Sequence, residues 1–298
     1  MSSEDLLKTP YWMAYRGDGK QPDGRDYDSR GEQGKYLADK PLVNAVNTAL
    51  AVQQPLLITG KSGTGKTMLA WSVASELGLL PVYEFHTRSD HRARDVLFIV
   101  DNLRRFYHAQ TNNPKAENIE NYVEWQALGK AIRSEKPAVV LIDEIDKAPR
   151  DFPNDLLDVV DKMEFTFPEL REEPFKATHR PIVIITSNSE RQLPDPFLRR
   201  CVFHYIEYPT TDQLLKILEQ RVSKNLDETL ARRAIARFEE LRSEELDLDK
   251  PPSTGELIVW MKLLIRAGVS AQALERYKRS ELPFLGAVIK NESDLRRL

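Results

Sequence analysis

Residues 60–67 match the phosphate-binding pattern G-x-x-x-x-G-K-[ST], in which each fixed residue type has a chemical task. The glycines allow a tight turn whose backbone N–H groups point at one phosphate chain. The ammonium group of Lys66 can reach terminal phosphates, and the hydroxyl of Thr67 can ligate Mg²⁺. A glycine-rich turn that only caps a helix gives no reason for this lysine and hydroxyl. The residues predicted to hold a nucleotide are Gly60, Lys61, Ser62, Gly63, Thr64, Gly65, Lys66, Thr67 and Met68.

The flanking sequence supplies the elements that such a loop needs. Residues 55–59 form a short apolar run that is typical of a buried strand, and residues 68–77 have the pattern of a helix that ends at Gly78. The free N–H groups and the dipole at a helix N-terminus both favour phosphate. Strand, loop and helix together predict a nucleotide-binding site.

Two acids follow a second apolar run. Residues 139–142 read as a strand that ends at Asp143 and Glu144. A carboxylate at the end of a strand beside the phosphate loop is placed to hold Mg²⁺, so we assign Asp143 to the metal together with Thr67. Glu144 can orient or deprotonate the water that attacks a γ-phosphate. A surface acid pair is the alternative, and without the phosphate loop it would be preferred.

An asparagine and two arginines come next. Residues 184–187 read as the end of a strand, and the amide of Asn188 at its edge could hydrogen-bond the γ-phosphate or the attacking water. Ser-Asn is also ordinary turn chemistry, so its position after the acidic strand is what gives it weight. Arg199 and Arg200 carry guanidinium groups, which can bind phosphate bidentately and stabilise negative charge. Surface ion pairing is the alternative for both.

The order of these features, followed by a helical C-terminal region, resembles the AAA+ ATPases and, within them, the MoxR family. The resemblance covers nearly everything from Tyr36 onwards. It implies ATP and Mg²⁺ as cofactors and a catalytic role for Glu144. It also implies that Arg200 is the arginine finger, with Arg199 as its close competitor. The implied positions are Lys66 and Thr67 for Walker A, Asp143 and Glu144 for Walker B, and Asn188 for sensor 1.

The resemblance also implies partners. In this family the arginine finger acts on ATP bound to the neighbouring subunit, which implies a ring, usually a hexamer. It further implies a chaperone-like motor that matures a protein client, often with a partner that carries a von Willebrand factor A domain. One departure concerns residues 251–257, where the family has a sensor-2 arginine and this sequence has none. Another cation does that task, or lid closure is coupled to ATP less directly.

Strand and helix patterns alternate up to Tyr208 and only helical patterns follow. We therefore predict an α/β fold, with a P-loop core whose mostly parallel sheet is flanked by helices and a small all-helical lid domain. The predicted domains are an irregular lead-in at 1–35, a nucleotide-binding core at 36–209 and a helical lid at 210–298. Residues 124–134 are expected to be helical. Phe165, Phe167 and Phe175 are either a client-contacting loop or core.

Composition places limits on function. The chain has 298 residues, a formal net charge of −3 and a single cysteine, Cys201, which excludes an internal disulfide framework and suits a reducing cytosol. No apolar run is long enough to cross a membrane and the N-terminus has no signal-peptide pattern, so we expect a cytoplasmic protein without membrane insertion.

Two other function classes stay open. A nucleic-acid-stimulated motor of helicase or restriction type would use the basic cluster at 88–105, although acids interleave with its arginines and the chain is slightly acidic. Nucleic acid is therefore not the expected partner. A slow nucleotide-dependent switch that acts as an assembly scaffold is the second alternative, and the missing sensor-2 arginine keeps it open.

Overall fold

The structure is a computed structural model that describes residues 11, 14–21, 28–29, 32–33, 36–223 and 225–298. The described residues divide into two compact units. Unit 1 contains residues up to 21, 36–60 and 66–206. Unit 2 contains 207–298 together with 61–65 and the short strands β1 (Asp28–Ser29) and β2 (Glu32–Gln33). The predicted lead-in at 1–35 lies largely outside the described residues.

Unit 1 is built on a five-stranded sheet in the order β11-β3-β10-β7-β4, and every neighbouring pair in it is parallel. This confirms the predicted α/β class. Because all five strands run the same way, their carboxyl ends meet at one edge of the sheet. The strands are β3 (Leu56–Thr59), β4 (Tyr83–His86), β7 (Val139–Asp143), β10 (Ile182–Ser187) and β11 (Val202–Tyr205).

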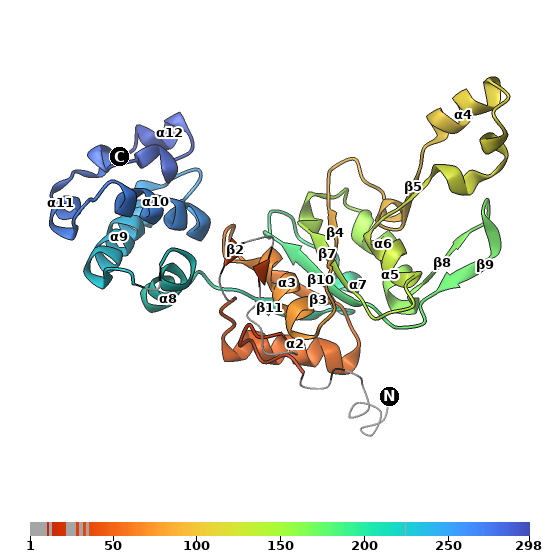
Figure 1. Ribbon diagram of the computed structural model, residues 1–298, viewed down its shortest axis with the longest axis horizontal. Coiled ribbons are helices and arrows are strands. Elements are labelled where there is room, and N and C mark those ends of the chain that lie inside the picture. Colours follow the sequence, from red (N-terminus) through yellow and green to blue (C-terminus); the bar gives the residue numbers. More distant parts are fainter. Residues whose placement is uncertain (1–10, 12–13, 22–27, 30–31, 34–35, 224) are drawn as a thin grey trace. The chain divides into compact units, whose positions relative to one another are not determined.

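Both faces of this sheet are buried, which is why its central strands read as continuous apolar runs. Alternate residues of a strand point to opposite faces. Leu57, Val140 and Ile185 pack with α5 (Ala127–Ile132) and α6 (Phe152–Lys162). Their sequence neighbours, among them Leu56, Leu141 and Ile184, pack in a second cluster with α2 (Lys40–Val52) and α3 (Lys66–Glu76). The helices therefore lie on both sides of the sheet (Figure 1).

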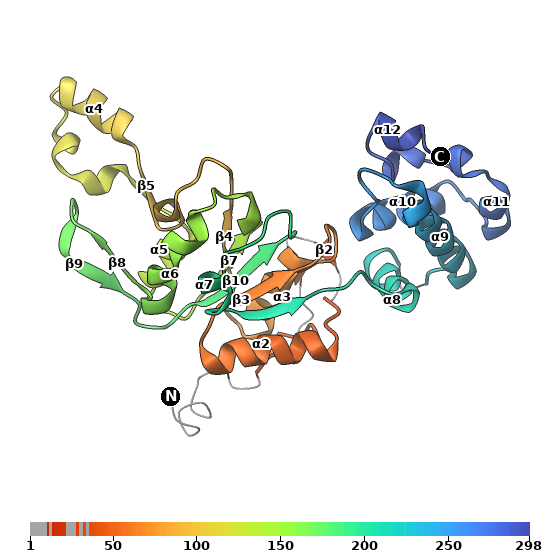
Figure 2. The same ribbon diagram turned by 180° about the vertical axis from the view of Figure 1, so that it is seen from behind.

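Two excursions leave the core of unit 1. The first, which we call the insert, runs from β5 (Phe98–Val100) through α4 (Asn102–Gln110) to β6 (Val123–Trp125), and β5 pairs antiparallel with β6. The second is the antiparallel hairpin of β8 (Glu164–Phe167) and β9 (Arg171–Lys176). Figures 1 and 2 show both projecting from the same end of the sheet. The short helix α7 (Asp195–Leu198) precedes β11.

Aromatic side chains join these two excursions. Phe98 of β5 stacks on Phe167 of β8 with ring centroids 4.1 Å apart, and Phe165 stacks on Phe175 at 5.0 Å. Trp125 of β6 lies edge-on to Phe175 at 5.4 Å. Such pairs add about 1 kcal/mol each beyond the area that they bury. The three phenylalanines of the hairpin are buried, so they belong to the core and are not a client-contacting loop.

Unit 2 is all-helical apart from β1 and β2 in its described residues, and it has its own core. Trp260, Phe238 and Leu257 are fully buried in it. Capping boxes begin two of its helices, with Thr210 and Gln213 at α8 and with Ser253 and Glu256 at α10. The helices are α8 (Thr211–Arg221), α9 (Glu228–Leu241), α10 (Thr254–Arg266), α11 (Ala271–Arg276) and α12 (Glu292–Leu295).

One predicted helix is wrong at its start. We expected a helix over 124–134, but residues 123–125 form strand β6 and the helix α5 begins at Ala127. The backbone of Glu124 pairs with Ile99 across the insert, and this pairing takes the place of helical hydrogen bonds. Trp125 therefore lies on a strand, where the guanidinium of Arg133 sits 3.9 Å from its ring centroid.

Candidate active site

The phosphate loop follows β3 and leads directly into α3. Its backbone has positive φ angles at Gly60 (151°), Gly63 (78°) and Gly65 (89°), a region that residues with a side chain rarely enter. This explains why glycine occupies these three positions. The hydroxyl of Thr64 donates to the carbonyl of Lys61 at 3.0 Å. A side chain at any of the three glycines would strain the turn.

Lys66 is the first residue of α3 and its ammonium group is buried. Its Nζ donates to the carbonyl oxygen of Gly60 at 2.8 Å, so the side chain folds back over the start of the loop. Burial lowers the pKa of Lys66, while the negative charges of Asp143, Asp146 and Glu144 act in the opposite direction. A cation held in a buried position beside a turn of glycines suits a phosphate chain.

Asp143 lies at the carboxyl end of β7, the strand beside β10. Its Oδ1 accepts from the Thr67 hydroxyl at 3.0 Å and from the Thr186 hydroxyl at 2.6 Å. Its Oδ2 lies 3.3 Å from Nδ1 of His86, which ends β4, and Nε2 of His86 lies 3.2 Å from Glu84. The structure thus brings together the two residues that sequence assigned to Mg²⁺. It adds Thr186 and His86, which sequence reasoning did not single out.

Glu144 has a left-handed backbone conformation with φ of 55°, which turns the chain sharply at the end of β7. Its backbone N–H donates to Thr186 Oγ1 at 2.9 Å. The Asn188 amide donates to Glu144 Oε1 at 3.0 Å, and the ammonium group of Lys147 donates to Oε2. The side chain that we expect to act on water is therefore held by the predicted sensor and by a lysine that sequence reasoning missed.

A buried carboxylate, Asp146, holds the loop that carries Asn188. Only 3% of Asp146 is exposed, and its oxygens accept from the backbone N–H groups of Asn188 at 3.1 Å and Glu190 at 3.0 Å. Buried donors left without a partner cost about 1–3 kcal/mol each, so this carboxylate fixes the position of the asparagine. The sequence offered no signal for it beyond a third acid after Asp143 and Glu144.

The two arginines differ in their surroundings. Arg200 Nε pairs with the carboxylate of Asp161 on α6, and its Nη1 donates to the carbonyl of Pro196 at 3.0 Å. The side chain of Arg199 is exposed, and among the described residues it makes no ion pair. The pair formed by Arg200 is itself half-exposed, so it is worth at most about 1 kcal/mol and can be exchanged for another anion. Cys201, which follows, is partly buried, and burial raises the pKa of its thiol to about 12.

The N-terminal residues 14–20 pack on α3, the helix that carries Lys66. Tyr15 is buried and its hydroxyl lies 3.0 Å from that of Ser72. The carboxylate of Glu76, at the end of α3, accepts three backbone hydrogen bonds, from Arg16 at 3.0 Å, Gly17 at 3.0 Å and Gly19 at 2.9 Å. Part of the predicted irregular lead-in is therefore tied to the phosphate-loop helix.

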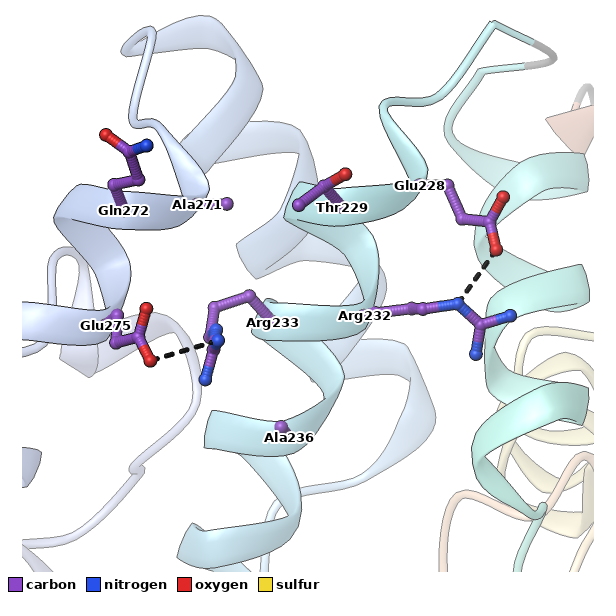
Figure 3. Close-up of a pocket in the computed structure, with 8 residues that line it drawn as sticks. All are labelled: Glu228, Thr229, Arg232, Arg233, Ala236, Ala271, Gln272 and Glu275. Carbon is purple, nitrogen blue, oxygen red and sulfur yellow. Dashed lines mark hydrogen bonds and ion pairs between the residues drawn. The ribbon is translucent and has the colours of Figure 1, made fainter.

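Unit 2 has a hollow of about 420 Å³ between α9 and α11 (Figure 3). Its charged side chains neutralise one another. Arg233 pairs with Glu275 at 3.0 Å and Arg232 pairs with Glu228 at 2.8 Å, as the dashed lines show. Because each cation in it faces a carboxylate, the hollow has no excess positive charge for phosphates. The lid region at 251–257 uses Ser253 and Glu256 to cap α10 and has no arginine.

The geometry around Lys66, Thr67 and Asp143 fits ATP and Mg²⁺. The glycine turn and the buried Lys66 suit a phosphate chain. The hydroxyl of Thr67 and the carboxylate of Asp143 offer hard oxygen ligands close together, which Mg²⁺ prefers. Glu144 and Asn188 lie beside them at the ends of adjacent strands. The fold and this arrangement define a P-loop nucleotide-binding protein.

Comparison with known proteins places the chain within that class. Residues 53–240 match the family described as AAA domain (Cdc48 subfamily), and the chain belongs to this family. A search of curated proteins finds no match. Among solved structures, the fold is similar to that of a RuvB point mutant from Thermotoga maritima. The identity is 13%, the TM-score is 0.45, and the match covers 80% of this chain and 74% of that one. In the part of the chain that the structure describes, every helix is too short or too polar to span a bilayer.

Proposed function

We propose that this protein hydrolyses ATP with Mg²⁺ and works as a ring-forming motor on a protein client. The observation that supports it best is the cluster at the carboxyl ends of β7 and β10, where Asn188 and Lys147 hold Glu144 and where Thr67 and Thr186 hold Asp143. Membership of the AAA family supports the same reaction. The MoxR-like role, maturation of a client with a von Willebrand factor A domain partner, rests on the sequence resemblance alone.

In this proposal each side chain has one task. The loop amides and Lys66 bind the phosphate chain, and Thr67 and Asp143 hold Mg²⁺, which when bound would neutralise charge on the phosphates. Glu144 accepts the proton of the attacking water, and Asn188 orients Glu144 through the 3.0 Å hydrogen bond. An arginine of the neighbouring copy, Arg200 or its competitor Arg199, stabilises the charge that develops on the transferred group.

A substitution of the proposed base tests the reaction. Glu144→Gln keeps the size of the side chain and its contact with Asn188, but it cannot take a proton. We expect nucleotide affinity, measured by titration of a fluorescent ATP analogue, to change little. We expect steady-state phosphate release to fall by about 10²- to 10⁴-fold, the usual contribution of a positioned base.

A matched substitution serves as the control. Glu190→Gln changes an exposed carboxylate two residues after Asn188, and it should leave both measurements near those of the unmodified protein. Turnover by Glu144→Gln equal to that of the unmodified protein would overturn the assignment of the base. Failure of the unmodified protein to bind the ATP analogue would overturn the proposed function itself.

A further inference from the structure

Helix α4 in the insert turns its apolar side chains towards solvent. Leu103, Phe106 and Tyr107 are 81%, 60% and 64% exposed, and their i, i+3 and i+4 spacing places them on one face of the helix. No residue of α4 is buried. A surface helix normally packs its apolar face on the core and turns its polar face to water, so this orientation is inverted. We call the three side chains the α4 face.

The side of α4 that contacts the rest of the insert is polar. Nδ1 of His108 lies 2.7 Å from the hydroxyl of Tyr122, and Nε of Arg105 donates to the carbonyl of Ala116 at 3.4 Å. The carboxylate of Asp101 caps the helix through the backbone N–H of Arg104 at 2.9 Å. These contacts fix which side of the helix faces inward. The outward apolar residues therefore follow from the local hydrogen bonding.

The insert holds α4 away from the sheet, and the two strands at its base are fixed by aromatic packing. Its two strands, β5 and β6, are braced by the aromatic contacts of Phe98 with Phe167 and of Trp125 with Phe175. Figures 1 and 2 show α4 at the far end of this excursion. A projecting helix with three exposed apolar side chains is a site for binding another molecule, because such patches are otherwise selected against in soluble proteins.

The charges on α4 indicate what kind of molecule would bind to the α4 face. Helix α4 carries Arg104 and Arg105 and no acidic residue, and among the described residues the Arg104 side chain has no carboxylate partner. A complementary surface is therefore apolar with carboxylates beside it. Nucleic acid fits less well, since binding to phosphates needs an excess of positive charge. The insert and the segment before it balance their basic residues with Asp90, Asp95, Asp101, Glu117, Glu120 and Glu124.

We propose that the α4 face is a docking surface for an acidic, apolar polypeptide segment. The identification of that segment as part of the motor's client rests on the proposed function, whereas the surface itself does not. In the bound state the three apolar side chains pack against leucine or phenylalanine side chains, and Arg104 faces a carboxylate at the edge of the contact.

The test is direct binding, measured by fluorescence anisotropy without ATP. The probe is a labelled 15-residue peptide in which leucine and phenylalanine alternate with aspartate and glutamate, and a second peptide has lysine in place of every acid. We expect the acidic peptide to bind more tightly than the basic one. The combined variant Leu103→Ser, Phe106→Ser and Tyr107→Ser should raise its Kd by on the order of tenfold to a hundredfold. Arg104→Glu should reverse the preference between the peptides.

Matched controls use exposed residues elsewhere. Val259→Ser with Ile265→Ser removes half-exposed apolar side chains from α10, and Arg276→Glu reverses a charge on α11; neither should change peptide binding. The proposal is overturned if the combined α4 variant binds the acidic peptide as tightly as the unmodified protein. It is also overturned if a labelled single-stranded oligonucleotide binds and the peptide does not, or if the variant loses self-assembly and keeps peptide binding. ATP hydrolysis is measured separately, so failure of the proposed function leaves this test intact.

Discussion

At the scale of single residues, Glu144, the proposed base, is constrained in both its side chain and its backbone. Both of its oxygens accept hydrogen bonds, one from Asn188 and one from Lys147, and its backbone is left-handed. A non-glycine residue in this conformation costs about 1 kcal/mol or more and persists where its surroundings enforce it. The hydrogen bond to Glu144 also raises the pKa of Lys147, and it occupies the carboxylate oxygen Oε2, which must leave the lysine before it can take a proton from water.

Removal of Lys147 should therefore speed the reaction. Because the pair is half-exposed, its worth is at most about 1 kcal/mol, so we expect Lys147→Met to raise ATP turnover by about two- to fivefold. The matched control is Lys162→Met, which breaks the exposed pair with Asp158 on α6 and should leave turnover unchanged. A fall in turnover for Lys147→Met, with Lys162→Met unaffected, would show that Lys147 contributes to the reaction directly.

Substitutions can also distinguish the roles of Arg199 and Arg200. We expect Arg200→Ala to lower turnover by on the order of a thousandfold, as loss of an arginine finger does, with nucleotide affinity nearly unchanged. Asp161→Asn removes the intrachain partner of Arg200 and should leave turnover intact, since Arg200 must leave that partner to act. If Arg199→Ala causes the large loss, and Arg200→Ala with Asp161→Asn only lowers the temperature of unfolding, the roles are exchanged.

Sequence predicted the residues whose chemistry is local to a motif and missed those that depend on strand register. Thr67 and Asp143 could be paired from the phosphate loop and the acidic strand alone. Thr186 reaches Asp143 because β10 pairs with β7 so that Ile185 lies beside Ile142, and no pattern in the sequence specifies that register. The roles of His86 and Asp146 depend on tertiary contacts in the same way.

At the scale of elements, α3 is fixed at both ends. The phosphate loop precedes it, and Glu76 at its last turn accepts backbone hydrogen bonds from residues 16, 17 and 19. Burial raises the pKa of Glu76 above its ordinary value of 4.5, against the effect of those hydrogen bonds. The N-terminal segment is therefore held to the helix by a carboxylate whose charged form is destabilised by burial.

The raised pKa of Glu76 makes the stability of the folded protein depend on pH. Between the ordinary pKa of 4.5 and the higher pKa in the folded state, the folded protein holds the proton of Glu76 more tightly than the unfolded chain. The free energy of unfolding therefore falls as pH rises through this window. Glu76→Gln cannot ionise, so we expect it to flatten that fall in urea titrations at successive pH values. The control substitution Glu117→Gln, at an exposed position, should leave the fall of the unfolding free energy with pH unchanged. If Glu76→Gln shows the same fall as the unmodified protein, the assignment of this pH dependence to Glu76 is wrong.

The elements that sequence predicted well are the buried ones. Strand β7 was predicted from an apolar pattern that burial imposes, and α9 lies in the region beyond Tyr208 where only helical patterns were predicted. Strand β9 was missed because it carries one buried side chain, Phe175, among exposed charged residues. The helix predicted from residue 124 failed since β6 pairs with β5, and only a partner strand that lies far away in the chain decides between the two structures.

At the scale of the whole molecule, the proposed ring predicts that active sites are shared between copies. Glu144→Gln retains the arginines and Arg200→Ala retains the base, so in a mixed assembly some sites gain an intact set. With equal amounts and random assembly, about a quarter of the sites are complete. We therefore expect the mixture to recover about a quarter of the turnover of the unmodified protein per subunit.

Turnover per subunit should also rise with protein concentration until assembly is complete. The control is a mixture of Glu144→Gln with the unmodified protein, which should show no recovery beyond the activity of the unmodified copies. A mixture of the two inactive variants that stays inactive, together with turnover that does not depend on concentration, would indicate that each chain works alone.

The order of strands in the sheet has a consequence for how the protein is made. Leu56 of β3 pairs with Ile184 on one side and with Val202 on the other, both of which leave the ribosome long after it. Until β10 and β11 have been synthesised, the apolar strand β3, which leads into the phosphate loop, has no hydrogen-bonded neighbour on either side. Non-local parallel pairing of this kind is slow and exposes the chain to aggregation. Any truncation before residue 202 therefore leaves β3 with an open edge, because Val202 begins the strand that covers it.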